Sequence, residues 1–261
     1  MQATVDGFGY GAVTPVAAFL VASLGGGIGL RCTVRARHLD SGRPKWLAYS
    51  ALSLGVGIWS MHFIAMMGFQ VHGAHIDYDA QLTFLSLAVA VLVVGVGVFA
   101  AGYAGQRTPV LLGAGLFMGL GVAAMHYLGM AAMQFSGTLH YSAPIVAASV
   151  GVAVVAATAA LWLIMNVRGF LVSLGASLLM GVAVCAMHYL GMEALTVELM
   201  AASGSTGSAV FTVLVPYLIG PFLVLFFAGA VLLFDPQTLE GDPVARSRSS
   251  AQGLTTRPPA G

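Results

Sequence analysis

The sequence predicts an all-α polytopic membrane protein with seven transmembrane helices. Its composition is 59% hydrophobic and only 7% charged, whereas ordinary soluble domains carry about 25% charged residues. Seven apolar runs reach the ~20 residues that a helix needs to cross a bilayer. A short histidine-containing motif also recurs in three of these runs. Together these observations exclude a soluble helical bundle and indicate an internally repeated membrane domain.

The seven predicted spans follow one another with short polar connections. They are Gly11 to Leu30, Trp46 to Phe69, Leu82 to Ala104, Pro109 to Met133, Pro144 to Asn166, Gly169 to Leu195, and Ala209 to Phe234. Glycine is abundant, at 34 residues, which suits helices that approach one another closely in lipid.

The basic residues predict the orientation of these spans. All ten lie on one side of the predicted membrane domain: Arg31, Arg35, Arg37, Arg43, Lys45, Arg107, Arg168, Arg246, Arg248 and Arg257. The positive-inside rule makes that side cytoplasmic, so the N-terminus is expected outside and the C-terminus inside. The nearly neutral net charge of +1 gives no indication of a nucleic-acid partner. The expected partner is the lipid bilayer.

The repeated motif divides the membrane domain. It reads MHFIAMMGF from Met61, MHYLGMAAM from Met125 and MHYLGMEAL from Met187, at the ends of spans two, four and six. The predicted repeat is therefore a helix hairpin of about 62 residues used three times in parallel orientation, with one further helix at the N-terminus. This gives an outer segment 1–10, a seven-helix domain 11–234 with repeats at about 46–104, 109–166 and 169–234, and a disordered cytoplasmic tail 235–261.

Each histidine of the motif shares a helix face with the methionine four residues later, about 40° away. The small residue at the third position, Ala65, Gly129 or Gly191, borders the same face. His62, His126 and His188 each precede the end of their span by the same number of residues, which corresponds to about 10 Å of depth. Because a histidine in a membrane span normally faces the interior of the bundle, the three imidazoles are expected to share one level.

Imidazole and thioether groups form a soft ligand set that favours copper, especially Cu(I), over magnesium or calcium. The predicted site consists of His62, His126 and His188 with one or more of Met66, Met130 and Met192. The alternative interpretation is three packing histidines beside methionines that fill gaps in the core.

The three motifs on alternate helices resemble the MHYT domain, a bacterial integral-membrane sensor family. The resemblance implies a multi-pass sensor in the bacterial cytoplasmic (inner) membrane, with copper near the outer face and oxygen, CO or NO as the signal. On motif matching it implies these ligands: Met61, His62 and Met66; Met125, His126 and Met130; Met187, His188 and Met192.

This chain departs from the family pattern at the fourth motif letter. Ile64, Leu128 and Leu190 stand where the threonine is expected, so no hydroxyl can serve as a ligand there. Many relatives also carry cyclic-dinucleotide or kinase modules, which are not expected here. A sensor of this kind would pass its signal to a separate cytoplasmic or membrane partner.

Six further residues are secondary candidates for a metal site: His72, His75, Asp77, Asp79, Cys185 and Glu193. The first four lie within eight residues of an outer loop, a spacing that suits surface metal capture. Solvated loop residues are the alternative. Cys185 borders the third histidine on its helix, and Glu193 distinguishes the third motif from the other two.

Three classes of function fit these features. The leading one is a signalling sensor with a buried copper site that binds a diatomic gas or changes redox state. The others are a b-haem membrane redox protein, in which facing His/His or His/Met pairs ligate the iron, and a copper carrier or metalloenzyme assembly factor. No enzymatic activity is expected, because no nucleophile with a base, no phosphate-binding loop and no paired carboxylates are found.

Overall fold

The computed structural model describes residues 4–37, 39, 42–104, 107–167, 169–200 and 210–234. This part of the chain folds into seven long helices, each long and apolar enough to cross a membrane. They are α1 (Val13–Arg37), α2 (Arg43–Met67), α3 (Ala80–Ala104), α4 (Thr108–Ala131), α5 (Ala143–Asn166), α6 (Phe170–Glu193) and α7 (Val210–Leu233). The predicted helical class and the seven apolar spans are confirmed. The predicted tail 235–261 lies outside the described residues.

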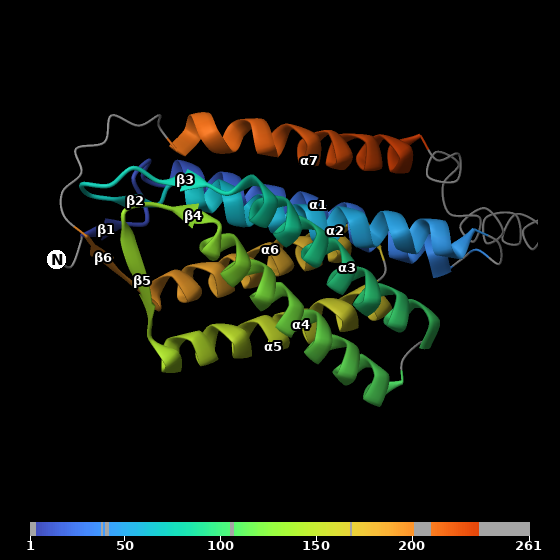
Figure 1. Ribbon diagram of the computed structural model, residues 1–261. Helices are drawn as coiled ribbons and strands as arrows, with labels where there is room; N and C mark the ends of the chain where they lie inside the picture. The colour runs from blue at the N-terminus through green and yellow to red at the C-terminus, as the bar shows by residue number, and fades with distance from the viewer. Residues whose placement is uncertain are drawn as a thin grey trace, which may run out of the picture.

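The first six helices form a closed ring. Each helix packs against the next in sequence, and α6 returns to pack against α1. α7 stands outside the ring and lies mainly on α2, with a smaller contact to α1 (Figure 1). The motif-bearing helices α2, α4 and α6 therefore alternate around the ring.

Two helices include basic residues that hydropathy predicts to lie in a loop. The apolar run ends at Leu30, but α1 continues to Arg37, and α2 already begins at Arg43. The Arg37 guanidinium donates a hydrogen bond to the Met165 carbonyl, near the end of α5. Hydropathy thus marked the apolar part of the helix and not its end. A cation beside the carbonyl end of a neighbouring helix is also electrostatically favourable.

Short strands occupy the end of the bundle at which α2, α4 and α6 finish (left in Figure 1). They form three two-stranded antiparallel sheets: β1 (Val5–Asp6) with β2 (Gln70–Val71), β3 (Asp77–Tyr78) with β4 (Met133–Gln134), and β5 (Gly137–Tyr141) with β6 (Leu195–Leu199). Polar loops were predicted here. The sequence did not predict these strands, because most of them are too short to show an alternation of polar and apolar residues.

The sheets group the helices in pairs. Each joins the segment before an odd-numbered helix to the segment after the following even-numbered helix, so α1 belongs with α2, α3 with α4, and α5 with α6. In this pairing α7 is the described helix that has no partner. The repeats predicted from the sequence instead begin at the second span, so that the first span is the unpaired helix. Both divisions keep the same spacing between the histidines.

Glycine allows α1 and α2 to pack backbone to backbone. A Cβ atom on Gly25 would lie 2.8 Å from the Gly57 Cα, so neither position has room for a side chain. Farther along this interface, the Thr33 and Ser50 hydroxyls are 2.7 Å apart, and Ser50 donates to the Gly29 carbonyl at 2.8 Å. Small residues and interhelical hydrogen bonds are the usual means of helix association in lipid.

Candidate metal centre

Three histidines meet on the inner side of the ring. His62 of α2, His126 of α4 and His188 of α6 each lie five residues before the last residue of their helix, and all three are buried. Their Nδ1 atoms form a triangle with sides of 3.0 Å (62 to 188), 3.2 Å (62 to 126) and 3.3 Å (126 to 188). The structure therefore brings together the three imidazoles that the repeats place at one level.

Hydrogen bonding alone does not satisfy this triangle. In a neutral imidazole each ring nitrogen is either a donor or an acceptor. Three mutually facing nitrogens cannot alternate in that way, so at least one of the three contacts is not a hydrogen bond. The centre of the triangle is about 1.8 Å from each Nδ1, close to the ~2.0 Å of a metal–imidazole bond. The donor set thus fits a single metal ion held by three imidazoles.

The rings keep this arrangement by packing edge to face. Their centroids are 5.0 to 5.1 Å apart, and the ring planes cross at 75° to 88°. Phe63 also lies edge-on to His62, with the ring centroids 4.8 Å apart. Side-chain packing therefore fixes the ring orientations that direct the three Nδ1 atoms towards one another.

Two glycines of the motif hold the outer edges of the rings. A Cβ atom on Gly129 would overlap the Nε2 of His62, and one on Gly191 would lie 2.5 Å from the Nε2 of His126. Neither Nε2 has a hydrogen-bond partner in the described residues. The sequence predicts that small residues border the histidine face, but the structure adds that each glycine accommodates the histidine of the preceding motif helix. The one available signal was glycine at the third position after His126 and after His188.

The motif methionines surround the triad unequally. Met61, Met66, Met125, Met130 and Met187 are buried, whereas Met192 is partly exposed. Met192 is the counterpart of Met66 and Met130 in the third motif, so the three copies differ at this position. The thioethers as ligands remain a prediction.

The structure does not gather the secondary candidates into one site. Among the described residues, only the histidine triad forms a group of three or more His, Cys, Asp or Glu side chains close enough to share a metal. His75 Nε2 lies 3.1 Å from Asp77 Oδ1, but the His72 side chain is exposed. Asp79 instead supports the start of α3, because its Oδ1 accepts the Leu82 N–H at 2.8 Å.

The two candidates on α6 are also separate from the triad. Cys185 is half-buried, and Glu193, the last residue of the helix, is exposed. Cys185 and Cys32 are both free thiols.

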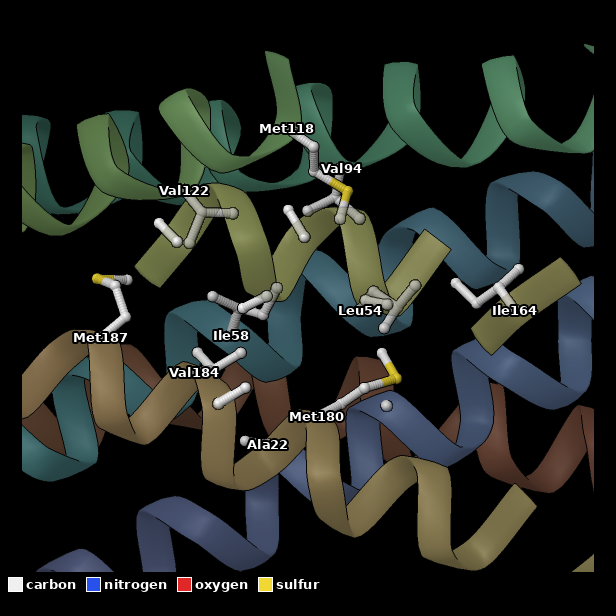
Figure 2. Close-up of a pocket in the computed structure, with 16 residues that line it drawn as sticks. Ala22, Leu54, Ile58, Val94, Met118, Val122, Ile164, Met180, Val184 and Met187 are labelled. Atoms are coloured by element: carbon white, nitrogen blue, oxygen red, sulfur yellow. The ribbon is translucent and has the colours of Figure 1, made fainter. Parts of the chain in front are cut away.

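An apolar cavity of about 40 Å³ lies on the inner side of the ring, and Figure 2 shows the residues that line it. Ile58, Val122 and Val184 line it, and each of these residues lies four positions before one of the three histidines. Met187 also contributes, and every lining side chain is apolar. A cavity of this size has room for a water molecule but offers no polar partner, and such cavities stay dry.

The fold and this site define a class of protein: a multi-pass helical membrane protein with a buried histidine cluster that can hold a metal ion. The family model of the MHYT repeat, described as a bacterial signalling protein N-terminal repeat, matches residues 55–114 and 119–176. The chain belongs to this MHYT repeat family.

Curated relatives place the chain among bacterial signalling proteins. It is 39% identical over 175 residues to the bifunctional diguanylate cyclase/cyclic di-GMP phosphodiesterase MucR of Pseudomonas aeruginosa. The matched region covers 64% of this chain and 25% of the relative. It is 38% identical over 190 residues to the cyclic di-GMP phosphodiesterase NbdA of the same organism, covering 70% and 24%. An uncharacterized signaling protein of Caulobacter vibrioides is 36% identical over 155 residues, covering 59% and 19%.

The chain spans about a quarter or less of the length of these relatives. The activities in their names belong to the whole relatives, whereas the similarity to this chain is confined to the shared part. No solved structure gives a significant match to the chain. Membership of this family supports a role in signalling or sensing.

Proposed function

We propose that this protein is a sensor of the bacterial cytoplasmic membrane in which His62, His126 and His188 hold a copper ion near the outer face. The observation that carries the proposal is the triangle of buried Nδ1 atoms, each 3.0 to 3.3 Å from the other two. In this proposal the signal is a diatomic gas, namely oxygen, CO or NO, or a change in the redox state of the metal.

The donors favour copper over hard cations. Imidazole suits copper, zinc, iron and nickel, whereas magnesium and calcium require oxygen ligands. No carboxylate of the described residues joins the triad, and buried methionines flank it. Thioether neighbours shift the preference further towards Cu(I). Bound copper would supply a centre that changes oxidation state or binds a small gas.

The adjacent cavity supports an apolar diatomic signal. Its wall consists only of apolar side chains and begins one helical turn from the three histidines. Charged or strongly polar solutes would lose their hydration there without compensation. Small apolar gases lose little, so this cavity favours them.

The ring explains how the site can transmit a signal. The three histidines lie on one helix of each helix pair, so a change at the metal acts on the whole ring of helices. A ligand transmits only through different affinities for two packings of the helices. In this proposal the change reaches the end of the bundle that carries Arg31, Arg35, Arg43 and Lys45, where a separate cytoplasmic or membrane partner would receive it.

The geometry disfavours the haem alternative. A haem iron with two histidine ligands needs them on opposite faces of a large macrocycle. Here the ring centroids are only 5.0 to 5.1 Å apart, and the adjacent cavity measures about 40 Å³. The three rings leave no space for a porphyrin between them.

Metal analysis of the purified protein tests the proposal. We expect about one copper ion per chain in the wild type, as for a single closed ligand set, and loss of that copper when His62, His126 and His188 are all replaced by alanine. His140→Ala is the matched control, because His140 is exposed on β5. Equal copper in the wild type and the triple variant would contradict the proposal.

Two further readouts separate the alternatives. A Soret band in the same preparation would favour a haem protein. Copper bound at the triad, with a copper-uptake defect on deletion and no spectral response to CO or NO, would favour a carrier or assembly factor.

A further inference from the structure

The position of α7 leaves a second, larger hollow on the outside of the ring. Because α7 lies mainly on α2, a groove of about 700 Å³ opens between α7, α1 and α6. Apolar side chains from all three helices line its length, among them Leu24, Leu178 and Phe226. These three side chains are exposed, so the described protein leaves the groove uncovered.

One end of the groove carries a single charge. Among the described residues that line it, Arg31 alone is charged. Its guanidinium carbon lies 5.0 Å from the centre of the Phe170 ring at the start of α6. Arg31 forms neither a hydrogen bond nor an ion pair with the described residues. The cation–π contact with a 64% exposed ring therefore does not neutralise the arginine.

The described protein has no anion that could reach Arg31. All of its acidic residues lie at the opposite, strand-bearing end of the bundle: Asp6, Asp77, Asp79, Glu193 and Glu198. The described basic residues lie at the Arg31 end: Arg31, Arg35, Arg37, Arg43, Lys45 and Arg107. Charged groups at membrane depth are usually paired, and no carboxylate of the described residues is placed to pair with Arg31.

We propose that this groove is a binding site for an anionic phospholipid. The acyl chains lie along the apolar walls formed by Leu24, Leu178 and Phe226, and the phosphate pairs with Arg31. The volume of the groove, about 700 Å³, lies in the range of about 300 to 1,000 Å³ that is typical of ligand sites. Basic pockets between transmembrane helices are known to recognise anionic headgroups.

A second copy of the chain fits the groove less well. Two copies in one membrane are oriented alike, so each would present its own basic end at the level of Arg31. Within the described residues no carboxylate lies at that level to pair with the guanidinium. Among the described residues, charge complementarity therefore favours a lipid phosphate over a helix of another copy.

Lipid-dependent thermal stability tests the proposal directly and requires no bound metal. The protein is purified in detergent and melted with added phosphatidylglycerol or, separately, with phosphatidylcholine. We expect phosphatidylglycerol to raise the melting temperature of the wild type more than phosphatidylcholine does. Arg31→Gln should abolish this difference, whereas Arg31→Lys should keep part of it because the cation remains.

Arg107→Gln is the matched control, because Arg107 is an exposed arginine at the start of α4 and does not line the groove. It should behave as the wild type does. If Arg107→Gln abolishes the difference between the two lipids as Arg31→Gln does, surface charge in general attracts the lipid, and the proposal is overturned. An undiminished lipid difference in Arg31→Gln would also overturn it.

A second pair of variants tests the groove itself. Ala230→Trp fills the groove, whereas Val155→Trp places the same ring on an exposed face of α5 outside it. We expect native mass spectrometry to show a retained anionic phospholipid in the wild type and in Val155→Trp but not in Ala230→Trp. Retention in Ala230→Trp would contradict the proposal. So would dimerisation of lipid-free wild type that Ala230→Trp abolishes, because the occupant would then be a second copy.

Discussion

Gly129 of α4 lies directly against the imidazole edge of His62 of α2, where any side chain at residue 129 would overlap the His62 Nε2. Gly191 of α6 has the same relation to His126 of α4. The motif therefore works between helices, because the glycine of one copy makes room for the histidine of the copy before it. This packing supports the Nδ1 triangle from outside and suggests the first prediction.

Gly129→Ala should displace the His62 ring and weaken metal binding without removing any proposed ligand. The added Cβ has no space, so either the ring or the helix must move. Gly113→Ala is the control on the same helix, because a Cβ there meets nothing within 4 Å. We expect the metal content after dialysis to fall at least severalfold in Gly129→Ala and to stay unchanged in Gly113→Ala. Equal metal retention in both variants would show that the glycine does not position the ring.

Removal of the metal should destabilise the wild type but not the variant that lacks the triad. A ligand that binds only the folded state at 100 times its dissociation constant adds about 2.7 kcal/mol. Thermal melts with and without a strong copper chelator measure the effect. We expect the chelator to lower the melting temperature of the wild type and of His140→Ala. The triple histidine variant should show no shift, and a shift of wild-type size in that variant would contradict the prediction.

The hydroxyl pair between α1 and α2 should contribute modestly to stability. Thr33 and Ser50 are both buried, and their hydroxyls are 2.7 Å apart. Ser50→Ala should lower the free energy of unfolding by about 1 kcal/mol, because the hydrogen bonds of the Ser50 hydroxyl are lost. In a double-mutant cycle with Thr33→Val, the coupling energy should be about 0.6 kcal/mol, as is typical of hydrogen bonds between helices in membranes. Unfolding in mixed detergents provides the measurement, and strictly additive losses would exclude a direct interaction.

Tyr78 of β3 should be replaceable by phenylalanine without loss of stability at neutral pH. Its hydroxyl is buried and has no hydrogen-bond partner in the described residues. Removal of an unsatisfied buried polar group is close to neutral or stabilising. The aromatic ring itself should be kept, because it packs edge to face on Phe63 of α2, with the two ring centroids 6.0 Å apart.

The same residue predicts a response to alkaline pH. Burial raises the pKa of Tyr78 above its ordinary value near 10. The unfolded state therefore loses this proton at a lower pH than the folded state does. The contribution of Tyr78 to stability is complete below about pH 10 and is lost as the pH rises above that value. Melting temperatures between pH 8 and 11 should fall less steeply for Tyr78→Phe, and parallel curves would contradict this account.

Filling the cavity should separate gas access from metal binding. Val122 lines the cavity one turn before His126, so Val122→Phe occupies the space without removing a proposed ligand. Val155→Phe, on the exposed surface of α5, is the control. We expect both variants to retain copper, and we expect the spectral change caused by CO or NO to be slowed at least tenfold only in Val122→Phe. An unchanged rate would place the route of the gas elsewhere.

Much of the fold could be predicted because a membrane imposes its demands on local sequence. Seven runs of apolar residues predicted seven helices, and equal positions within the repeats placed His62, His126 and His188 at one level. The end of α1 was misplaced by seven residues because hydropathy reports contact with lipid, whereas the helix continues through Arg31, Arg35 and Arg37. The short strands were missed because two-residue pairings depend on partners distant in sequence.

The sequence by itself determined which residues recur, how deep they lie and what chemistry their side chains offer. It could not determine which helices are neighbours, because every apolar face is equally satisfied by lipid or by another helix. Only the tertiary structure decided that α1 closes the ring with α6 while α7 stays outside. That closure brings three Nδ1 atoms within 3.3 Å of one another and converts three separate motifs into one candidate metal centre.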